Sequence, residues 1–429
     1  MRYNVSTVRV VKGRKMNYQR IVKGILDIGE AMLKSGAENF RLDDSMYRMC
    51  KAYGFKHSDV FAIPSNIQIT VETQDGEFIT QIRHIENLDT NFDRLDYLND
   101  LCRYVCANTP DEDELHAKFR EVMDRPQQKP AWRYAASIVS GACFVVFFGG
   151  GFIDAIIAAI VAFLVVFAGD ALSKRENNLL IYNTLLAFMA ELLILFFWKS
   201  GVDLHPESIM IGIVMLLISA MSTTNGIRDL LQRDYISGGI NIMNSFLGAA
   251  GIAIGIALAM LLLYDIQPTE GTVTANSTIV RLLSCSIGCV GFAVMFKVKG
   301  KQVVYSGIGA FFTWAIYMAI YSIRPSNFLA TFVGASFVAL YAFAMSRINK
   351  APSTIFLTAS VFPLIPGAAL YYTMYGFVSQ DYELVMNQLF TLFTTCIAIS
   401  LAFLMVDVII RTVMHELKRE YHIGKNTIF

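Results

Sequence analysis

The stretch Gly149–Leu172, GGGFIDAIIAAIVAFLVVFAGDAL, decides the fold of this 429-residue chain. Three glycines precede a long apolar run, and a bilayer core of about 30 Å is crossed by about 20 such residues in a helix. We therefore predict a transmembrane helix over residues 152–172, with a very tight connection at the glycines before it.

Similar apolar runs lie on both sides of this stretch. We predict ten transmembrane helices, at residues 132–148, 152–172, 178–198, 207–226, 238–263, 277–296, 302–321, 326–345, 353–375 and 387–410. The fold class expected is a polytopic α-helical membrane protein.

A charged N-terminal region precedes these helices. Residues 1–129 hold 19 of the 36 Lys and Arg residues and 20 of the 35 Asp and Glu residues, so most of the charge lies in the first third of the chain. The pattern predicts two helices, three strands with a turn at Asp75-Gly76, and two more helices. We expect residues 1–130 to form a soluble α+β domain, and without an apolar signal segment we expect it to stay in the cytoplasm.

The positive charges of the short loops predict the orientation of the helices. If the N-terminal domain is cytoplasmic, 14 of the 17 Lys and Arg residues after residue 129 flank the inner ends of the ten helices. The outer flanks hold Lys199, Arg281 and Arg324, and the long loop from Asp265 to Ser277 holds none. Both termini are then cytoplasmic.

The membrane part shows weak internal similarity. Arg133–Phe148 (RYAASIVSGACFVVFF) resembles Arg281–Phe296 (RLLSCSIGCVGFAVMF), and Asp234-Tyr235 resembles Asp381-Tyr382. We predict two five-helix units, 131–264 and 277–411, and a cytoplasmic tail, 412–429. Because five is odd, the two units would have opposite orientations in the membrane, an arrangement common in secondary transporters.

No cofactor is expected. The sequence has no Gly-x-x-x-x-Gly-Lys-Ser/Thr motif and no Gly-x-Gly-x-x-Gly after a strand, so transport would run on an ion or substrate gradient. The seven cysteines lie on helical patterns without histidines at matching spacing, which predicts neither a disulfide framework nor a metal site. No nucleic-acid partner is expected.

Four segments resemble the bacterial threonine/serine exporter family in its full-length fused form. They are Leu33–Asp44 (LKSGAENFRLDD), Ala62–Val71 (AIPSNIQITV), Asn225–Gly239 (NGIRDLLQRDYISGG) and Pro363–Leu370 (PLIPGAAL). The resemblance spans nearly the whole chain and implies export of a small polar metabolite across the bacterial cytoplasmic membrane.

The chain departs from this family pattern at two places. Ser219-Ala220 stands where the first unit usually has Pro-Gly, and Arg233-Asp234 stands where the family has Gly-Asp. Related two-chain members of the wider superfamily are associated with dicarboxylate (succinate) export. The resemblance therefore implies a small polar substrate more firmly than it implies threonine.

Glu191 is the clearest candidate for ion coupling. It lies past the midpoint of the third predicted helix without a basic neighbour within a turn, and ionisable groups at membrane depth are costly and usually functional. Glu191 is expected either to carry a proton or contact a substrate ammonium group, or to be a neutral acid hydrogen-bonded inside the bundle. Asp170, near the cytoplasmic end of the second helix, is a second-rank candidate.

A second group of candidates follows the fourth predicted helix. A zwitterionic amino acid needs a cation for its carboxylate and an acceptor for its ammonium group, which Arg228 and Asp229 could supply. Asn225 and Asp234 lie beside them, and an ordinary charged loop is the alternative interpretation. Asn241, on the fifth helix, is explained either by substrate contact or by interhelical packing.

Pro363, Pro366 and Gly367 are expected to break the ninth helix. A broken helix frees backbone groups that can bind substrate or ions, and a simple kink is the alternative. The function predicted from all these features is secondary-active export of threonine and serine, driven by protons, with possible homo-oligomerisation. The alternatives are dicarboxylate export, with Arg228 holding a carboxylate, and a membrane-anchored hydrolase; no enzymatic activity is expected.

Overall fold

The computed structural model describes residues 17–86, 88–176, 178–218, 220–231, 233–263 and 276–426, without the side chains of several residues between 220 and 231 and of those after 413. The predicted loop after the fifth helix lies mostly outside this range. The chain divides into two compact units, Met1–Gln127 with Leu404–Phe429, and Gln128–Phe403. Each unit is described by itself.

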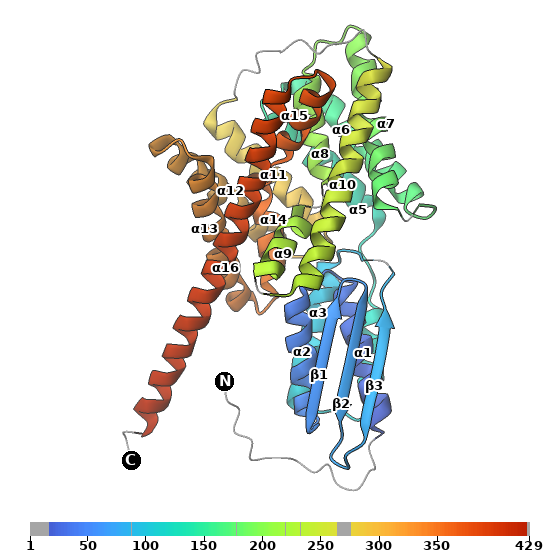
Figure 1. Ribbon diagram of the computed structural model, residues 1–429, viewed down its shortest axis with the longest axis vertical. Helices are drawn as coiled ribbons and strands as arrows, with labels where there is room; N and C mark the ends of the chain where they lie inside the picture. The colour runs from blue at the N-terminus through green and yellow to red at the C-terminus, as the bar shows by residue number, and fades with distance from the viewer. Residues whose placement is uncertain are drawn as a thin grey trace. The chain divides into compact units, whose positions relative to one another are not determined.

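The described N-terminal part of the first unit, residues 17–127, contains four helices and a three-stranded antiparallel sheet (Figure 1). Its elements are α1 (Tyr18–Leu33), α2 (Asn39–Ala52), β1 (His57–Ile63), β2 (Asn66–Glu72), β3 (Phe78–His84), α3 (Phe92–Asn108) and α4 (Glu112–Met123). Asn17 caps α1, and Gly76 adopts φ 85° in the turn between β2 and β3.

The core of this unit lies between the sheet and its helices. The strand order is β1-β2-β3, with Val60 opposite Ile69 and Ile69 opposite Gln81. Ile67, Ile69 and Val71 alternate on the buried face of β2 because successive side chains of a strand point to opposite faces. Helices α1 and α2 cover this face and bury their own apolar stripes against it.

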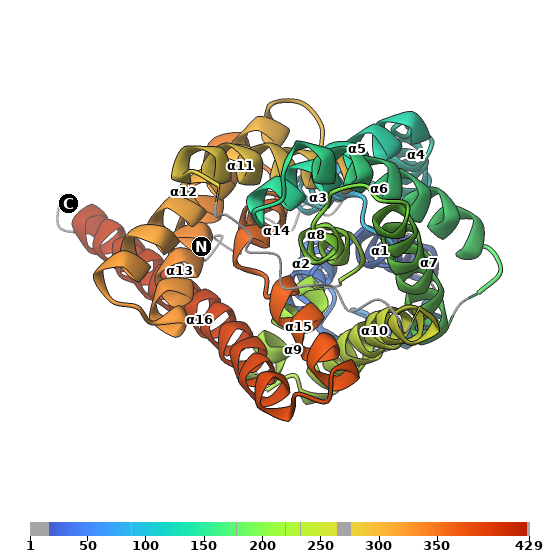
Figure 2. The ribbon, with the colours of Figure 1, turned by 90° about the horizontal axis from the view of Figure 1, so that it is seen from above.

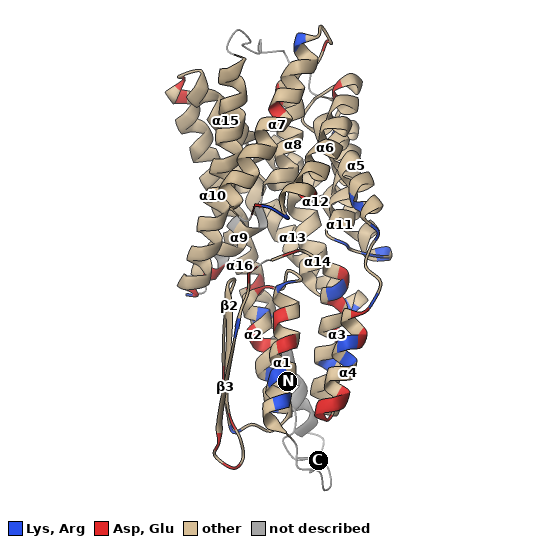
Figure 3. Ribbon diagram, turned by 90° about the vertical axis from the view of Figure 1, so that its right-hand side faces the viewer, with Lys and Arg blue, Asp and Glu red and all other residues tan. Residues whose placement is uncertain are grey.

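The second unit consists of long apolar helices that carry few charges (Figure 3). The long helices are α5 (Pro130–Phe147), α6 (Phe152–Leu172), α7 (Leu179–Lys199), α10 (Tyr235–Leu262), α11 (Thr278–Met295), α12 (Lys301–Ile323), α13 (Asn327–Asn349) and the first part of α16 (Tyr382–Asn426), whose residues from Leu404 onward belong to the first unit. α16 continues well beyond the predicted helix 387–410, and its part Tyr382–Val413 is apolar enough to cross a membrane.

The number of uninterrupted spans differs from the prediction of ten. Among the described residues, eight helices are long and apolar enough to cross a membrane, or nine if one bent pair forms a single span. The bent pair is the predicted ninth helix, which is broken as expected: α14 (Ser353–Val361) and the 3₁₀ turn η1 (Phe362–Leu364) precede α15 (Gly367–Val378), with a bend of 43°.

The prediction of a continuous fourth helix over 207–226 is wrong. The structure has two helices there, α8 (Pro206–Leu217) and α9 (Ala220–Leu231). Ile218 has an extended backbone (φ −71°, ψ 129°), which ends the helical hydrogen-bonding pattern of α8. At 12 residues, α8 rises about 18 Å, which is less than a bilayer core.

The two broken helices lie among the long ones. α8 packs against α5, α6, α7 and α15, and α14 packs against α11, α12 and α13. Figure 2, the view from above, shows α8 inside an arc formed by α5, α6, α7 and α10. The breaks therefore lie in the interior of the helical unit.

Helix boundaries recur along the second unit at one constant offset in residue number. α8, α9 and α10 begin at Pro206, Ala220 and Tyr235, and α14, α15 and α16 begin at Ser353, Gly367 and Tyr382. The same offset relates Ile218, after α8, to Ile365, after η1. Ile365 has φ −70° and ψ 128°, nearly the backbone angles of Ile218.

Residues with a left-handed backbone recur in the same way. Three pairs of residues with positive φ share nearly this offset: Gly149 with Lys297, Gly201 with Lys350, and Arg233 with Gln380. Each residue is the first or second after the end of a helix, where this conformation closes the last turn. The connections, and not only the helices, are therefore similar along the chain.

Candidate functional site

Glu191 lies in the interior of the second unit. It is on α7, its side chain is fully buried, and neither carboxyl oxygen has a hydrogen-bond partner among the described residues. Ala187 and Ile194, which share its helix face, belong to a hydrophobic cluster completed by α8 and α15. A carboxyl group without partners is expensive in such surroundings, so its presence calls for a reason other than stability.

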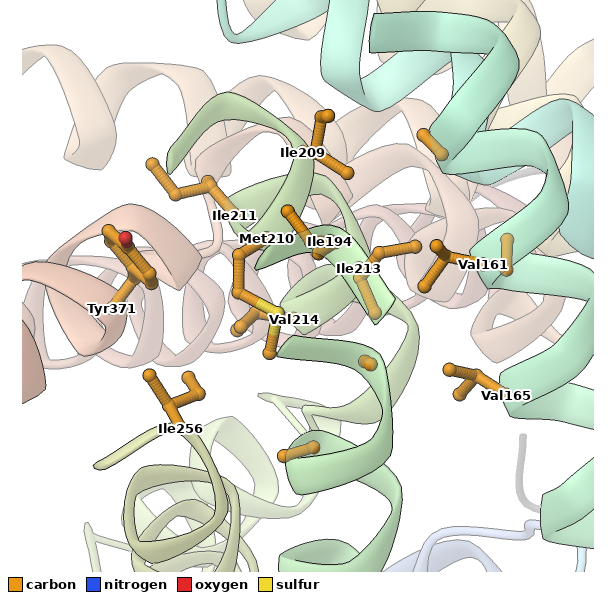
Figure 4. Close-up of a cluster of buried hydrophobic side chains, with 14 of the residues drawn as sticks. Val161, Val165, Ile194, Ile209, Met210, Ile211, Ile213, Val214, Ile256 and Tyr371 are labelled. Carbon is orange, nitrogen blue, oxygen red and sulfur yellow. The ribbon is translucent and has the colours of Figure 1, made fainter. Parts of the chain in front are cut away.

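Two further polar groups approach Glu191 from the broken helices. Glu207 lies in the first turn of α8, Tyr371 lies on α15, and both are within electrostatic range of Glu191. The Tyr371 hydroxyl is buried without a hydrogen-bond partner in the described structure, and Tyr372 donates a hydrogen bond of 3.3 Å to Glu207. Figure 4 shows Tyr371 beside Met210 and Ile211 of α8.

The convergence of these groups was not visible in the sequence. Glu207 follows Pro206 at a helix start, where an acidic residue is ordinary, and Tyr371 is one of several aromatic residues in an apolar segment. Only the crossing of α8 and α15, two halves of broken helices, brings them to Glu191.

The candidates near the start of α10 form a second cluster. Asp229 of α9 is buried and accepts hydrogen bonds from Ser237 (3.1 Å) and Asn241 (3.2 Å). Asp234 caps α10 by accepting from the Ser237 backbone N–H at 3.3 Å. The structure thus brings together Asp229, Asp234 and Asn241, while Asn225 is half-buried on α9. The Arg228 side chain lies outside the described residues.

Asp170 is already engaged within the helical unit. Arg133 of α5 forms an ion pair with it, and the Tyr134 hydroxyl donates a hydrogen bond of 2.9 Å to its other oxygen. Two partners on one neighbouring helix favour a role in holding α5 and α6 together. This arrangement differs from that of Glu191, for which the described residues supply no such partners.

The break at Pro363, Pro366 and Gly367 is a site of close packing. A side chain at Gly367 would place its Cβ 2.6 Å from the Met215 sulfur, so the start of α15 packs directly on the end of α8 and a larger residue at 367 would require Met215 to move. The two broken helices therefore meet where each is interrupted.

Sequence reasoning missed an acidic group at the start of α6. Asp154 is buried and accepts hydrogen bonds from the backbone N–H of Gly151 (2.7 Å) and of His205 (2.8 Å). The ring Nδ1 of His205 lies 2.9 Å from Oδ2 of Asp154. Asp154 therefore ties the beginning of α6 to the residue that precedes α8, and capping explains it.

No metal site accompanies these groups in the described ranges. Nowhere in them do three His, Cys, Asp or Glu side chains lie close enough to hold a metal ion. In the first unit, His57 lies 3.2 Å from Asp59, both exposed, and Ser58 projects from the opposite face of the strand.

The eight described helices that are long and apolar enough to cross a membrane define a polytopic α-helical membrane protein. The sequence pattern of the family described as "Putative threonine/serine exporter" matches residues 23–263, and that of "Threonine/Serine exporter, ThrE" matches residues 281–409. The chain belongs to the threonine/serine exporter family.

Two curated relatives support this assignment. The chain is 22% identical over 372 residues to a protein named threonine/serine exporter from Corynebacterium glutamicum, which covers 82% of this chain and 75% of the relative. It is 20% identical over 380 residues to a probable threonine/serine exporter from Mycobacterium tuberculosis (strain ATCC 25618 / H37Rv). That alignment covers 85% of this chain and 72% of the relative. No solved structure matches the chain.

Proposed function

We propose that this protein is a secondary-active exporter of small polar metabolites, with threonine and serine as its substrates and the proton gradient as its driving force. The observation that carries the proposal is Glu191, a fully buried carboxyl group without hydrogen-bond partners among the described residues, in electrostatic range of groups on both broken helices. An acid in this position can change its protonation state when the helices around it move, which couples proton transfer to conformational change.

The proposal includes an inverted duplication of the membrane part. It counts α8 with α9, and α14 with α15, as one broken span each, so that each half has five spans. The recurring helix starts, the matching backbone of Ile218 and Ile365, and the left-handed pairs support this count. Two halves in opposite orientation can exchange conformations and so expose a central site to each side in turn.

Charges at the left-handed positions support the opposite orientation of the halves. In the proposed topology Lys297, Lys350 and Arg233 face the cytoplasm, and their partners Gly149, Gly201 and Gln380 face outward. The inner member of every pair is a cation and the outer member is uncharged. This is the distribution that the positive-inside rule requires, at positions with the same backbone conformation.

The proposed substrate path includes the cluster around Asp229. Its carboxylate, with Asn241 and Asp234, would receive a substrate ammonium group at the cytoplasmic side, and Asn225 and Arg228 would bind the carboxylate. The interrupted backbone at Pro363, Pro366 and Gly367 would supply further polar groups next to α8. The N-terminal unit and both termini would be cytoplasmic, in a bacterial cytoplasmic membrane.

Transport by the purified full-length protein tests the proposal. Vesicles containing the protein would be loaded with labelled threonine, serine or succinate, and efflux would be measured with and without an imposed pH gradient. Gradient-dependent efflux of threonine and serine is expected, and light scattering before reconstitution would show whether the protein is a homo-oligomer. Efflux of succinate alone would favour the dicarboxylate alternative, and no efflux of any of the three would refute the exporter.

A further inference from the structure

Arg281 is a cation inside the helical unit for which the described residues offer no carboxylate. It lies on α11, is half-buried, and forms no ion pair with any described residue. Its guanidinium carbon lies 5.8 Å from the ring centre of Phe147 on α5 and 5.5 Å from that of Trp314 on α12. The sequence analysis placed Arg281 at the outer flank of a helix; in the structure it lies in the first turn of α11, with its side chain against aromatic faces.

Arg281 lies in the first turn of α11, about 5 Å along the helix from its start, and its side chain reaches a ring deeper in α12. α12 begins at Lys301 and ends at Ile323. From the helical rise, Trp314 is about 20 Å from the first end of this helix and about 14 Å from the second. A half-buried guanidinium group against these rings has lost part of its hydration, and a counter-charge would compensate for that loss.

The corresponding arginine of the first half is neutralised. Arg133 aligns with Arg281 in the two similar segments, each is the fourth residue of its helix, and Arg133 forms an ion pair with Asp170 of α6. The helices that pack most closely on α11, namely α5, α12 and α14, contain no Asp or Glu. The second half thus keeps the arginine, and these neighbouring helices offer it no carboxylate.

A second polar group beside Arg281 is also unpaired in the described structure. Trp314 is 8% exposed, and its indole Nε1 has no hydrogen-bond partner among the described residues. An indole nitrogen can only donate a hydrogen bond, so it needs an acceptor. Tyr317 stacks on the Trp314 ring at 4.6 Å, and Phe147 packs edge-on against it at 4.7 Å, which fixes the position of the ring.

We propose that Arg281 and Trp314 form a binding site for the carboxylate of a small solute, which would rest on the guanidinium group and accept the indole N–H. The site is separate from Glu191, since it lies on α11 and α12. A planar guanidinium binds a carboxylate through two parallel hydrogen bonds, and the aromatic rings form an apolar wall beside it. If the proposed export function holds, this solute is the amino acid in transit.

Trp314 itself can report occupancy of the site. The chain has three tryptophans, so a Trp132→Phe/Trp198→Phe variant of the full-length protein keeps Trp314 alone. Its fluorescence in detergent would be titrated with L-threonine, with acetate, and with L-threoninol, which lacks the carboxylate. Threonine and acetate should change the emission in a saturable way, and threoninol should not.

Variants of the arginine give the matched comparison. Arg281→Gln should weaken threonine binding about 10- to 100-fold, the loss expected for hydrogen bonds to a charged group. Arg281→Lys, which keeps the charge, should weaken it less, and Arg324→Gln, at the exposed end of α12, should leave it unchanged. If Arg281→Gln does not fold, the comparison of threonine with threoninol in the parent still tests whether the site requires a carboxylate.

The outcomes separate the site from the transport proposal. Three results would overturn the carboxylate site. The Trp314 emission could stay unchanged with threonine and acetate, Arg281→Gln could bind threonine as tightly as the parent, or the emission could respond only to added phosphatidylglycerol. Efflux from vesicles without any Trp314 response would refute the site and leave the exporter. A carboxylate-specific response without efflux would refute the exporter and leave the site.

Discussion

Replacing Glu191 with glutamine and with methionine separates its cost to stability from its role in transport. Burying a polar group without a hydrogen-bond partner costs about 1–3 kcal/mol. Both oxygens of Glu191 lack a partner among the described residues, so methionine, of similar length and apolar, should raise the free energy of unfolding by about that amount. Glutamine keeps a buried polar group and should leave stability close to that of the parent.

Coupled transport, in contrast to stability, should be lost with both substitutions. Neither glutamine nor methionine can take up or release a proton, so pH-gradient-driven efflux of threonine should fall to the level of empty vesicles in both variants. The assays are efflux from reconstituted vesicles and thermal unfolding in detergent. A protein that becomes more stable while it loses coupling would show that Glu191 is retained for function.

Asn183 on the same helix provides a control of opposite sign. It is buried and donates a hydrogen bond of 3.2 Å to the Gly248 carbonyl oxygen, so Asn183→Leu should destabilise the protein by about 1–3 kcal/mol. The reasoning on Glu191 is refuted if Glu191→Met unfolds at a lower temperature than the parent, because the carboxyl group would then have partners. Efflux by Glu191→Gln at the parent rate would remove Glu191 from the coupling mechanism.

Three other results are expected. Gly251→Val should prevent correct packing of α10, because a Cβ there would lie 2.5 Å from a backbone oxygen of α7. Gly239→Ala on the same helix should be tolerated, because its Cβ would meet nothing within 4 Å. Size-exclusion profiles of the two variants would show the difference. Burial raises the pKa of the Cys50 and Cys102 thiols to about 12, so N-ethylmaleimide at pH 8 should modify neither until the protein is denatured, as mass spectrometry would show. Asp170→Asn should lower the unfolding temperature and keep pH-gradient-dependent efflux, since its ion pair with α5 is structural; loss of coupling would contradict this.

Much of the helical arrangement could be predicted from the sequence, because long apolar runs and loop charges are local signals. The break in the ninth helix was predictable from Pro363, Pro366 and Gly367, since proline cannot continue the helical hydrogen bonds. The break at Ile218 could not be predicted in this way, because neither proline nor glycine stands there. Its only signal was indirect: the offset that relates Asp234 to Asp381 also relates Ser219-Ala220 to Pro366-Gly367.

The candidate site was only partly predictable, because burial and partners depend on tertiary packing. Glu191 stood out by its apolar surroundings in the sequence. Asp170 looked similar, but the structure supplies Arg133 from a neighbouring helix as its partner. Glu207 and Tyr371 carried no local signal, since only the crossing of two broken helices brings them near Glu191.

The lysines in left-handed turns have a consequence for the synthesis of the protein. A non-glycine residue in this conformation costs roughly 1–2 kcal/mol, so Lys297 and Lys350 make the finished protein less stable than glycine would. On the proposed topology, the same side chains retain their loops in the cytoplasm while the helices enter the membrane. Lys297→Gly should therefore strengthen the folded turn and yet lower the fraction of chains inserted in the correct orientation, which reporter fusions to the neighbouring loops would measure.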